Sequence, residues 1–311
     1  MTALLSLIAP IFVLIGAGYA AVRLGYASEQ LIQALGGFVL NFALPALILY
    51  ALLQQDLRET LNWNYILAYS AGSLAVFLAM LLFLRAGLTR SLPQAAIAAL
   101  GGSASNSGFV GFPVASLALG APALTALPLT MLVENILVIP LALALAEMGM
   151  QEGQTPARVV RNTLRRLART PLILAILLGV ILSALGLHLP GPLATALDMM
   201  ADASVPCALF VVGGTLAGLK AGSLATDVSA IVVAKLILHP LAVTGAFLLI
   251  GGVPPGLMAA GIILASSPML TIYPILGARF GYDRVCAAAL LVATTLSFIT
   301  LAVVLALVLP G

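Results

Sequence analysis

Long apolar stretches follow one another along the whole chain and are separated by short polar segments. Each stretch is close to the roughly 20 residues that a helix needs to cross a bilayer. The pattern predicts an all-α membrane protein with ten transmembrane helices. The stretches fall near residues 4–24, 31–53, 63–84, 94–119, 122–148, 171–187, 193–218, 227–250, 256–277 and 285–309.

The composition excludes a soluble globular domain. The chain is 62% hydrophobic and 7% charged, whereas a soluble domain carries roughly 25% charged residues. Cys207 and Cys286 lie inside apolar stretches and are interpreted as small hydrophobic residues rather than a redox pair. The first stretch has no basic segment before it and no obvious cleavage site, so we expect a retained helix rather than a signal peptide. No extramembrane domain is expected, because the longest polar connection covers only residues 149–170.

Basic residues gather in alternate connections. Of the 13 Lys and Arg residues, eleven fall after the first, third, fifth, seventh or ninth stretch. Positive residues mark cytoplasmic connections, so we predict a multi-pass protein of the bacterial inner membrane with both termini outside the cytoplasm. The eleven are Arg23, Arg85, Arg90, Arg158, Arg161, Arg165, Arg166, Arg169, Lys220, Arg279 and Arg284. Arginines of the 149–170 linker either form a basic face for anionic lipid headgroups or are only a topology signal.

The two halves of the chain repeat each other. A shift of 161 residues superimposes four prolines and two glycines: Pro10 on Pro171, Pro45 on Pro206, Pro93 on Pro254, Pro113 on Pro274, Gly18 on Gly179 and Gly25 on Gly186. The halves, residues 1–148 and 171–311, each hold five stretches. Because five is odd, the second half must cross in the opposite sense. A 5+5 inverted repeat of this kind occurs in many secondary transporters.

The fourth and ninth stretches are rich in residues that interrupt a helix. Residues 101–113 read Gly-Gly-Ser-Ala-Ser-Asn-Ser-Gly-Phe-Val-Gly-Phe-Pro, and residues 265–274 read Ala-Ser-Ser-Pro-Met-Leu-Thr-Ile-Tyr-Pro. Interrupted spans at matching places in two halves predict a transporter binding site, with helix N-termini that favour an anion. The alternative is a pair of kinked packing helices. Candidate binding residues are Ser105, Asn106, Ser107, Pro113, Ser266, Ser267, Pro268, Tyr273 and Pro274.

Further polar residues lie inside apolar stretches, where ionisable groups usually face a cavity or one another. Asn41, Glu134, Asn135 and Lys235 are added to the candidate binding residues. Asp198, Asp202, Glu134, Lys235 and His239 are candidates for coupling transport to protons or sodium ions. Lys235 could also pair with Glu134 or extend to the membrane surface, and Asp198 could lie at the outer interface.

Enzymatic function is not indicated. The chain has no Gly-x-Ser-x-Gly elbow, no His-Glu-x-x-His helix and no phosphate-binding Gly-Lys-Ser/Thr motif. We expect no cofactor, no metal and no nucleic-acid partner. Two classes stay open: a secondary carrier for a small organic anion, and a cation or proton antiporter or sodium-coupled symporter, with a channel as a further alternative.

Several motifs, in order, resemble the auxin efflux carrier family, which includes plant PIN carriers and bacterial malate, malonate and oxalate permease-like proteins. They are Asn41-Phe-Ala-Leu-Pro-Ala-Leu47, Asn106 to Pro113, Glu134-Asn135, Lys235-Leu236 with Pro240, and Ala265-Ser-Ser-Pro268 running to Gly281. The chain lacks the long central loop of plant carriers and has Ser267-Pro268-Met269 in place of their Asn-Pro-Asn, which argues against auxin as the substrate.

The resemblance implies more than the residues alone indicate. It implies a scaffold of helices 1, 2, 6 and 7, often a homodimer, and a transport domain of helices 3–5 and 8–10 in which the broken helices 4 and 9 cross. It also implies elevator-like movement of a carboxylate across the membrane.

Overall fold

A computed structural model of the protein describes residues 2–53, 61–150, 169–187, 189–218 and 225–308, and all regular secondary structure in these ranges is helical. The prediction of an all-helical protein is therefore confirmed for the described part of the chain. Some basic residues that entered the topology argument lie outside these ranges, namely Arg58, Arg158, Arg161, Arg165, Arg166 and Lys220.

The first half of the chain forms α-helices interspersed with π-helical turns, written η. In chain order they are α1 Thr2–Arg23, α2 Glu29–Phe38, η1 Val39–Ala43, α3 Leu44–Leu53, α5 Trp63–Leu82, η2 Phe83–Gly87, α6 Leu92–Ser103, η3 Ser107–Gly111, α7 Phe112–Leu119, α8 Ala121–Val133, η4 Glu134–Val138 and α9 Ile139–Met150.

The second half continues in the same way. Its elements are α11 Pro171–Ala184, α12 Gly191–Asp202, α13 Ser204–Gly218, α14 Ala225–Val233, η5 Ala234–Leu238, α15 His239–Ile250, α16 Pro255–Ala265, α17 Tyr273–Ala278 and α18 Asp283–Val308.

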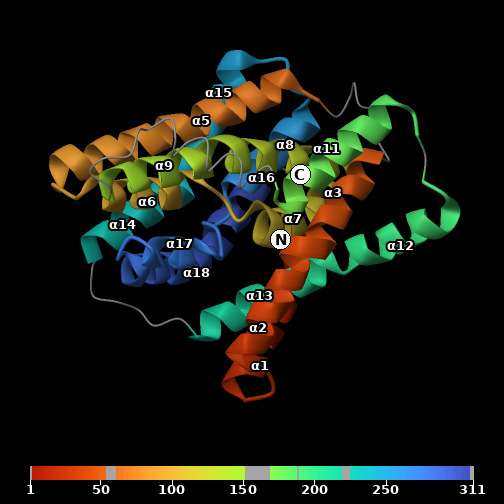
Figure 1. Ribbon diagram of the computed structural model, residues 1–311, viewed down its shortest axis with the longest axis horizontal. Coiled ribbons are helices and arrows are strands. Elements are labelled where there is room, and N and C mark those ends of the chain that lie inside the picture. The colour runs from red at the N-terminus through yellow and green to blue at the C-terminus, as the bar shows by residue number, and fades with distance from the viewer. Residues whose placement is uncertain (1, 54–60, 151–168, 188, 219–224, 309–311) are drawn as a thin grey trace.

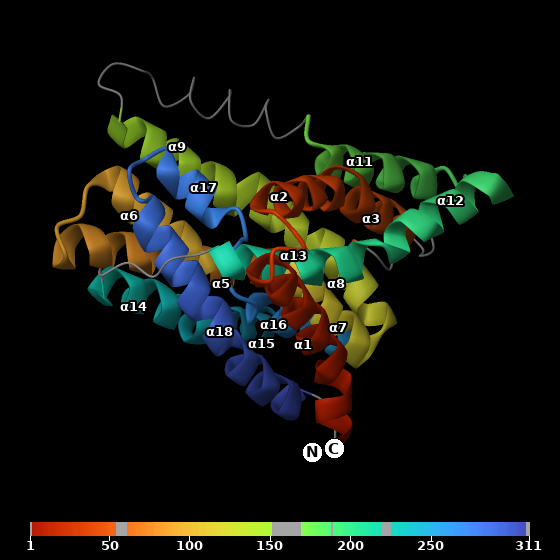
Figure 2. The same cartoon turned by 90° about the horizontal axis from the view of Figure 1, so that it is seen from below.

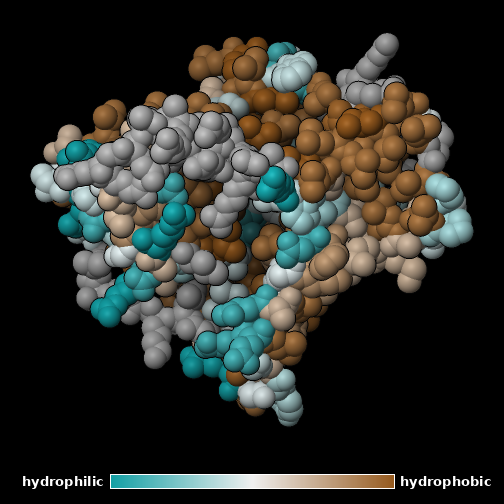
Figure 3. All heavy atoms as spheres, in the orientation of Figure 1, coloured by the Kyte–Doolittle hydropathy of each residue, from teal (hydrophilic) through white to brown (hydrophobic). Residues whose placement is uncertain are grey.

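Six continuous helical stretches among the described residues are long and apolar enough to cross a membrane: Glu29–Tyr50, Trp63–Gly87, Ala121–Met150, Gly191–Ala217, Thr226–Ile250 and Asp283–Val308. Shorter apolar helices cover Val13–Arg23, Pro171–Ser183 and Pro255–Ala265. Figure 3 shows hydrophobic side chains over much of one face, and Leu174, Leu177 and Ile181 of α11 are among the exposed apolar residues. Lipid must cover such a surface, so the chain is an integral multi-pass membrane protein.

The helices pack in two groups (Figures 1 and 2). In one group α1 and α2 pack on α13, and α3 packs on α11 and α12. In the other, α5 packs on α6 and α15, α6 on α9, α8 on α16, and α17 on α18. The groups meet where η3 and α7 contact α13 and α7 contacts α1. The interrupted segment that contains η3 thus lies at the junction between the groups.

Glycines permit the closest helix contacts within each group. A Cβ atom at Gly18 of α1 would collide with the Phe210 carbonyl of α13, and one at Gly213 would collide with the Ile15 carbonyl of α1. In the other group a Cβ at Gly72 of α5 would lie 2.6 Å from the Val243 Cα of α15. Small residues of this kind bring membrane helices together where the hydrophobic effect cannot. Each group is therefore held by backbone-to-backbone packing across the two halves of the chain.

Proline accounts for most of the π-helical turns. Among the described residues, four such turns end two residues before a proline: η1 before Pro45, η3 before Pro113, η4 before Pro140 and η5 before Pro240. Proline has no N–H to donate, and its ring pushes against the carbonyl group four residues earlier. A wider turn with i→i+5 bonds relieves that contact. Such turns often occur at functional sites, and here they contain Asn41, Ser107, Glu134 and Lys235.

Candidate functional site

The chain leaves the helical path at two places that contact each other. α6 ends at Ser103, Ala104 is extended, and helical structure resumes at Ser107. α16 ends at Ala265 and α17 begins at Tyr273. The Asn106 backbone N–H donates to the Pro268 carbonyl at 2.7 Å, and the Asn106 side-chain Nδ2 donates to Thr271 Oγ1 at 2.7 Å. Asn106 therefore joins the two interruptions through both its backbone and its side chain.

Glu134, the first residue of η4, lies beside the first interruption and is 1% exposed. Its Oε1 accepts a hydrogen bond from the Ser105 N–H at 2.9 Å, and Ser107 Oγ lies 2.9 Å from both carboxylate oxygens. The Tyr69 hydroxyl of α5 donates to the same Oε1 at 3.4 Å. A buried carboxylate needs such donors to offset its lost hydration. Most of them come from the interrupted segment, so its path and the position of Glu134 depend on each other.

Lys235, the second residue of η5, is 0% exposed. Its Nζ donates to Ser105 Oγ at 2.7 Å and to the Ala265 carbonyl at 2.8 Å, and lies 2.7 Å from His239 Nδ1. An ammonium group has three N–H donors, and each has an acceptor. Lys235 therefore points inward between the two interruptions, and extension toward the membrane surface does not describe this structure.

His239 continues the polar chain beyond Lys235. Its Nε2 lies 2.9 Å from Ser73 Oγ of α5, and its ring meets the Tyr69 ring edge-on at 5.9 Å between centroids. Since Nδ1 accepts from the Lys235 ammonium, the remaining ring hydrogen belongs on Nε2, where it donates to Ser73. A neutral histidine of this tautomer accounts for the bonds to Lys235 and Ser73, and Nδ1 also lies 3.1 Å from the Ala265 carbonyl, which Lys235 Nζ contacts too.

Ser105 connects the two buried charges. Its N–H donates to Glu134 and its Oγ accepts from Lys235. Lys235 and Glu134 do not form a direct ion pair. The ion pairs among the described residues are Arg90 with Asp227 and Arg279 with Glu147. The described part of the chain contains no group of three His, Cys, Asp or Glu residues that could hold a metal ion.

The remaining candidates from the interrupted segments are buried nearby and bond to the backbone. Ser266 Oγ donates to the Ile262 carbonyl at 2.7 Å, and Ser267 Oγ donates to the Ile263 carbonyl at 3.3 Å. The Tyr273 hydroxyl donates to the Ile97 carbonyl of α6 at 3.0 Å. Pro113 and Pro274 lie in the first turns of α7 and α17. These residues shape the helix ends around Lys235 and Asn106.

Four other candidates lie apart from this cluster. Asn41 is exposed and its Nδ2 donates to the Gly37 carbonyl at 2.8 Å. Asn135 is half-buried, and its amide donates to the Met131 carbonyl at 2.8 Å. Both amides thus replace backbone donors in a widened π-helical turn. Asp198 is half-buried and Asp202 exposed on α12. The structure does not bring either aspartate to Glu134 or Lys235.

Three polar residues of the cluster were not among the sequence candidates: Tyr69, Ser73 and Thr271. The first two belong to a run on α5 spaced by four residues, which begins at Tyr65, whose hydroxyl lies 2.6 Å from Thr130 Oγ1. Side chains four residues apart lie on one face of a helix. The spacing of Tyr65, Tyr69 and Ser73 in the third apolar stretch was therefore an available signal for a buried polar face.

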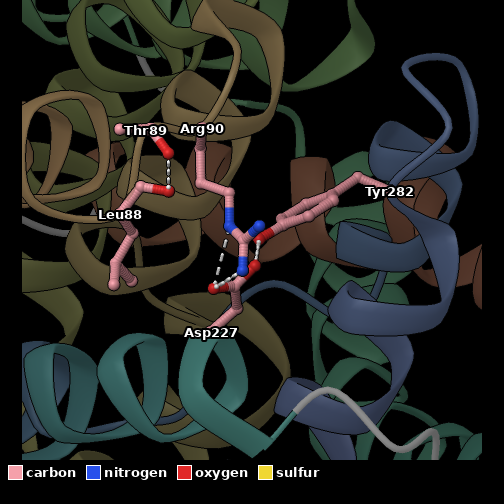
Figure 4. Close-up of polar contacts among 5 residues, drawn as sticks. All are labelled: Leu88, Thr89, Arg90, Asp227 and Tyr282. Carbon is pink, nitrogen blue, oxygen red and sulfur yellow. Dashed lines mark hydrogen bonds and ion pairs between the residues drawn. The ribbon is translucent and has the colours of Figure 1, made fainter.

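A second polar cluster consists of Arg90, which precedes α6, Asp227 in the first turn of α14, and Tyr282, which precedes α18 (Figure 4). The Arg90 guanidinium donates to Asp227 Oδ1 through Nε at 3.2 Å and Nη2 at 3.0 Å, and the Tyr282 hydroxyl donates to Oδ2 at 2.5 Å. Burial and the Asp227 carboxylate raise the pKa of Tyr282 well above its ordinary value, so this hydroxyl stays a donor. The cluster ties the α5–α6 connection to the starts of α14 and α18.

Comparison with known proteins identifies relatives along the whole chain. The sequence pattern of the family described as "Membrane transport protein" matches residues 3–305. A Rhizobium meliloti (strain 1021) protein named "Putative malonate transporter" is 31% identical over 313 residues, which cover 100% of this chain and 98% of that protein. "Uncharacterized transporter YfdV" of Escherichia coli (strain K12) is 28% identical over 83% of this chain and 86% of its own length.

Proposed function

Because the chain belongs to the membrane transport protein family, we propose that it is a secondary active transporter or facilitator that carries a small organic anion, a carboxylate, across the membrane. The name of the Rhizobium meliloti relative supports a dicarboxylate such as malonate as the first solute to test. The names of the family and of its relatives indicate a transporter rather than an enzyme.

The observation that carries this proposal is the meeting of two interrupted helices beside a buried ammonium group. Lys235 lies between Ser105 of one interruption and Ala265 at the edge of the other. An ionisable group at such depth is costly and usually serves a solute or ion pathway. A carboxylate that displaced the Ala265 carbonyl or Ser105 Oγ from Nζ would form an ion pair with the ammonium in place of a hydrogen bond to an uncharged acceptor.

Backbone amides would complete the anion site. In η3 the first helical bonds run from the N–H groups of Val110 and Gly111 to the Asn106 carbonyl. The amides of Ser107 and Gly108 precede those bonds and belong to the N-terminal turn, where the helix dipole favours negative charge. Asn106 would contribute its side-chain amide. These groups together match the donors that a small carboxylate requires.

The two packing groups support an elevator-type mechanism. In our proposal the five helices of each half form an inverted repeat, α1–α3 and α11–α13 form a scaffold that pairs in a homodimer, and the other helices form the transport domain. The interrupted helices α6–α7 and α16–α17 cross within that domain and carry the solute past the scaffold. The contacts of η3 and α7 with α13 and α1 would then be the sliding surface.

A buried carboxylate next to a lysine also suits the second class, a cation or proton antiporter or a sodium-coupled symporter. The two classes differ in what moves. An anion carrier transports labelled malonate, with or without a proton or sodium gradient. A cation antiporter moves protons against sodium or potassium ions without any organic solute.

Proteoliposomes containing purified protein test the proposal directly. We expect uptake of labelled malonate that unlabelled dicarboxylates inhibit, and loss of this uptake in Asn106→Ala although the variant folds and is inserted. Asn135→Ala is the matched control, since the Asn135 amide donates to the Met131 carbonyl one turn earlier in the same helix, and should retain uptake. Sodium-driven proton movement in the absence of any carboxylate would contradict the proposal, as would wild-type uptake by Asn106→Ala.

A further inference from the structure

The two buried charges are connected by a chain of hydroxyl groups with a single direction. Lys235 Nζ donates to Ser105 Oγ at 2.7 Å, Ser105 Oγ lies 3.4 Å from the Tyr69 hydroxyl, and that hydroxyl donates to Glu134 Oε1 at 3.4 Å. Because the Tyr69 hydrogen is directed to the carboxylate and Ser105 accepts from Lys235, the Ser105 hydrogen belongs on the bond to Tyr69. Every donor then points from the ammonium toward the carboxylate.

We propose that Ser105 and Tyr69 relay a proton from Lys235 to Glu134 and so neutralise both charges when the carrier is empty. Lys235 Nζ gives one proton to Ser105 Oγ, Ser105 gives its own proton to the Tyr69 oxygen, and Tyr69 gives its proton to Glu134 Oε1. The products are a neutral amine, two unchanged hydroxyl groups and a neutral carboxylic acid. No proton enters or leaves the protein.

The energetics of burial give the step its purpose. An ammonium and a carboxylate without direct contact both pay for lost hydration inside a membrane protein. A bound anion offsets that cost at Lys235, so the ammonium form is favoured while solute is present. With the site empty, hydrogen bonds with uncharged groups offset it only in part, and the neutral form crosses the membrane more easily. This inference rests on the proposed function, because it concerns the return of the empty carrier.

The geometry also makes the relay conditional. The links on either side of the Tyr69 oxygen, at 3.4 Å each, are longer than the roughly 2.7–2.8 Å usual between hydroxyl oxygens. Proton transfer needs both to shorten, and a small shift of α5 relative to Ser105 and η4 would shorten them. Meanwhile Ser107 Oγ, which donates to Glu134, and the Ala265 carbonyl, which accepts from Lys235, hold the two charges in place. Tyr69 is therefore a relay residue that is not required to anchor either charge.

Two transport modes separate the relay from solute binding. Net efflux of labelled malonate into solute-free medium requires the carrier to return empty, whereas exchange against external malonate returns it loaded. We expect Tyr69→Phe to slow net efflux by about a hundredfold, the lower end of what a positioned proton-transfer group contributes, and to leave exchange close to wild type. Tyr65→Phe is the matched control, because it removes a buried hydroxyl one turn away on the same helix face. It should leave both modes unchanged.

Equal loss of both modes in Tyr69→Phe, or wild-type behaviour in both, would overturn the relay. Infrared spectroscopy provides a test without transport. Solute-free wild type should show a protonated carboxyl band that Glu134→Gln removes and that malonate diminishes. Absence of a Glu134-dependent band from the solute-free protein would overturn the neutral pair. Wild-type protein that exchanges no carboxylate contradicts the proposed function instead, and the infrared test of the pair still applies.

Discussion

Replacement of Lys235 by methionine should reveal how strongly the two buried charges depend on each other. The change keeps a long unbranched side chain and removes the donor that serves Ser105 Oγ, His239 Nδ1 and the Ala265 carbonyl. It also leaves Glu134 without its basic partner, so that its carboxyl group either stays ionised and uncompensated or takes up a proton from solvent. Removing one partner of a buried pair typically costs about 3–5 kcal/mol. Since Ser105 separates these two charges, we expect the lower end of that range, about 3 kcal/mol.

The measurement is a thermal melt of purified protein, followed by loss of the monodisperse species. At roughly 2–4 °C per kcal/mol, Lys235→Met should melt about 6–12 °C below wild type. Glu134→Gln keeps an acceptor for the Ser105 and Ser107 donors and should lose less. The double variant removes both charges, and its loss should be about 1–2 kcal/mol smaller than the sum of the single losses, within the range seen for residues of one network.

The same chain contains an ion pair with which this double-mutant cycle of Lys235 and Glu134 can be compared. Arg90 and Asp227 are in direct contact, with 3.0 Å between Nη2 and Oδ1, so Arg90→Met with Asp227→Asn reports the coupling of a true ion pair. The reasoning is refuted if Lys235→Met and Glu134→Gln add within roughly 0.5 kcal/mol, as independent sites do, or if Lys235→Met melts as wild type does.

Two further predictions concern topology and packing. A C-terminal alkaline phosphatase fusion should be active and a C-terminal fluorescent protein dark, because the distribution of positive residues predicts external termini; the opposite result would remove the inverted-repeat argument. Gly213→Val should destabilise the protein by about 2 kcal/mol or more, since its side chain would collide with the Ile15 carbonyl. Gly16→Ala in α1, whose Cβ would meet nothing within 4 Å, should melt as wild type does.

The sequence was most informative where composition alone decides structure. Apolar length predicted ten membrane helices, and six of them are long, apolar and continuous among the described residues. The Gly, Ser and Pro residues between 101 and 113 lie where α6 ends and Ala104 is extended. The spacing of Lys235 and His239 placed them one turn apart, and they are bonded. In each case the physical cause is local, because hydrogen-bonding capacity within a few residues determines whether a helix continues.

Rotation of helices against one another could not be derived in this way. The shift of 161 residues superimposes Asn41 on Asp202, yet both are exposed in the structure, and the amide of Asn41 bonds within its own helix. Tyr69 is in the cluster because α5 turns that face toward Ser105. Periodicity gives the residues that share a face but not the neighbour that the face meets. That choice depends on close packing such as Gly72 on Val243.

The prolines that follow the π-helical turns have a consequence for how each helix is oriented along its length. One extra residue in a turn advances every later side chain by about 100° relative to a regular α-helix. In the span from α14 to α15, side chains at helical spacing before η5 therefore lie on a different face of the helix from those at the same spacing after it. Pro240→Ala would allow the turn to close and rotate the segment that contains Lys235 against the rest. The site would then be lost without any change to a polar side chain.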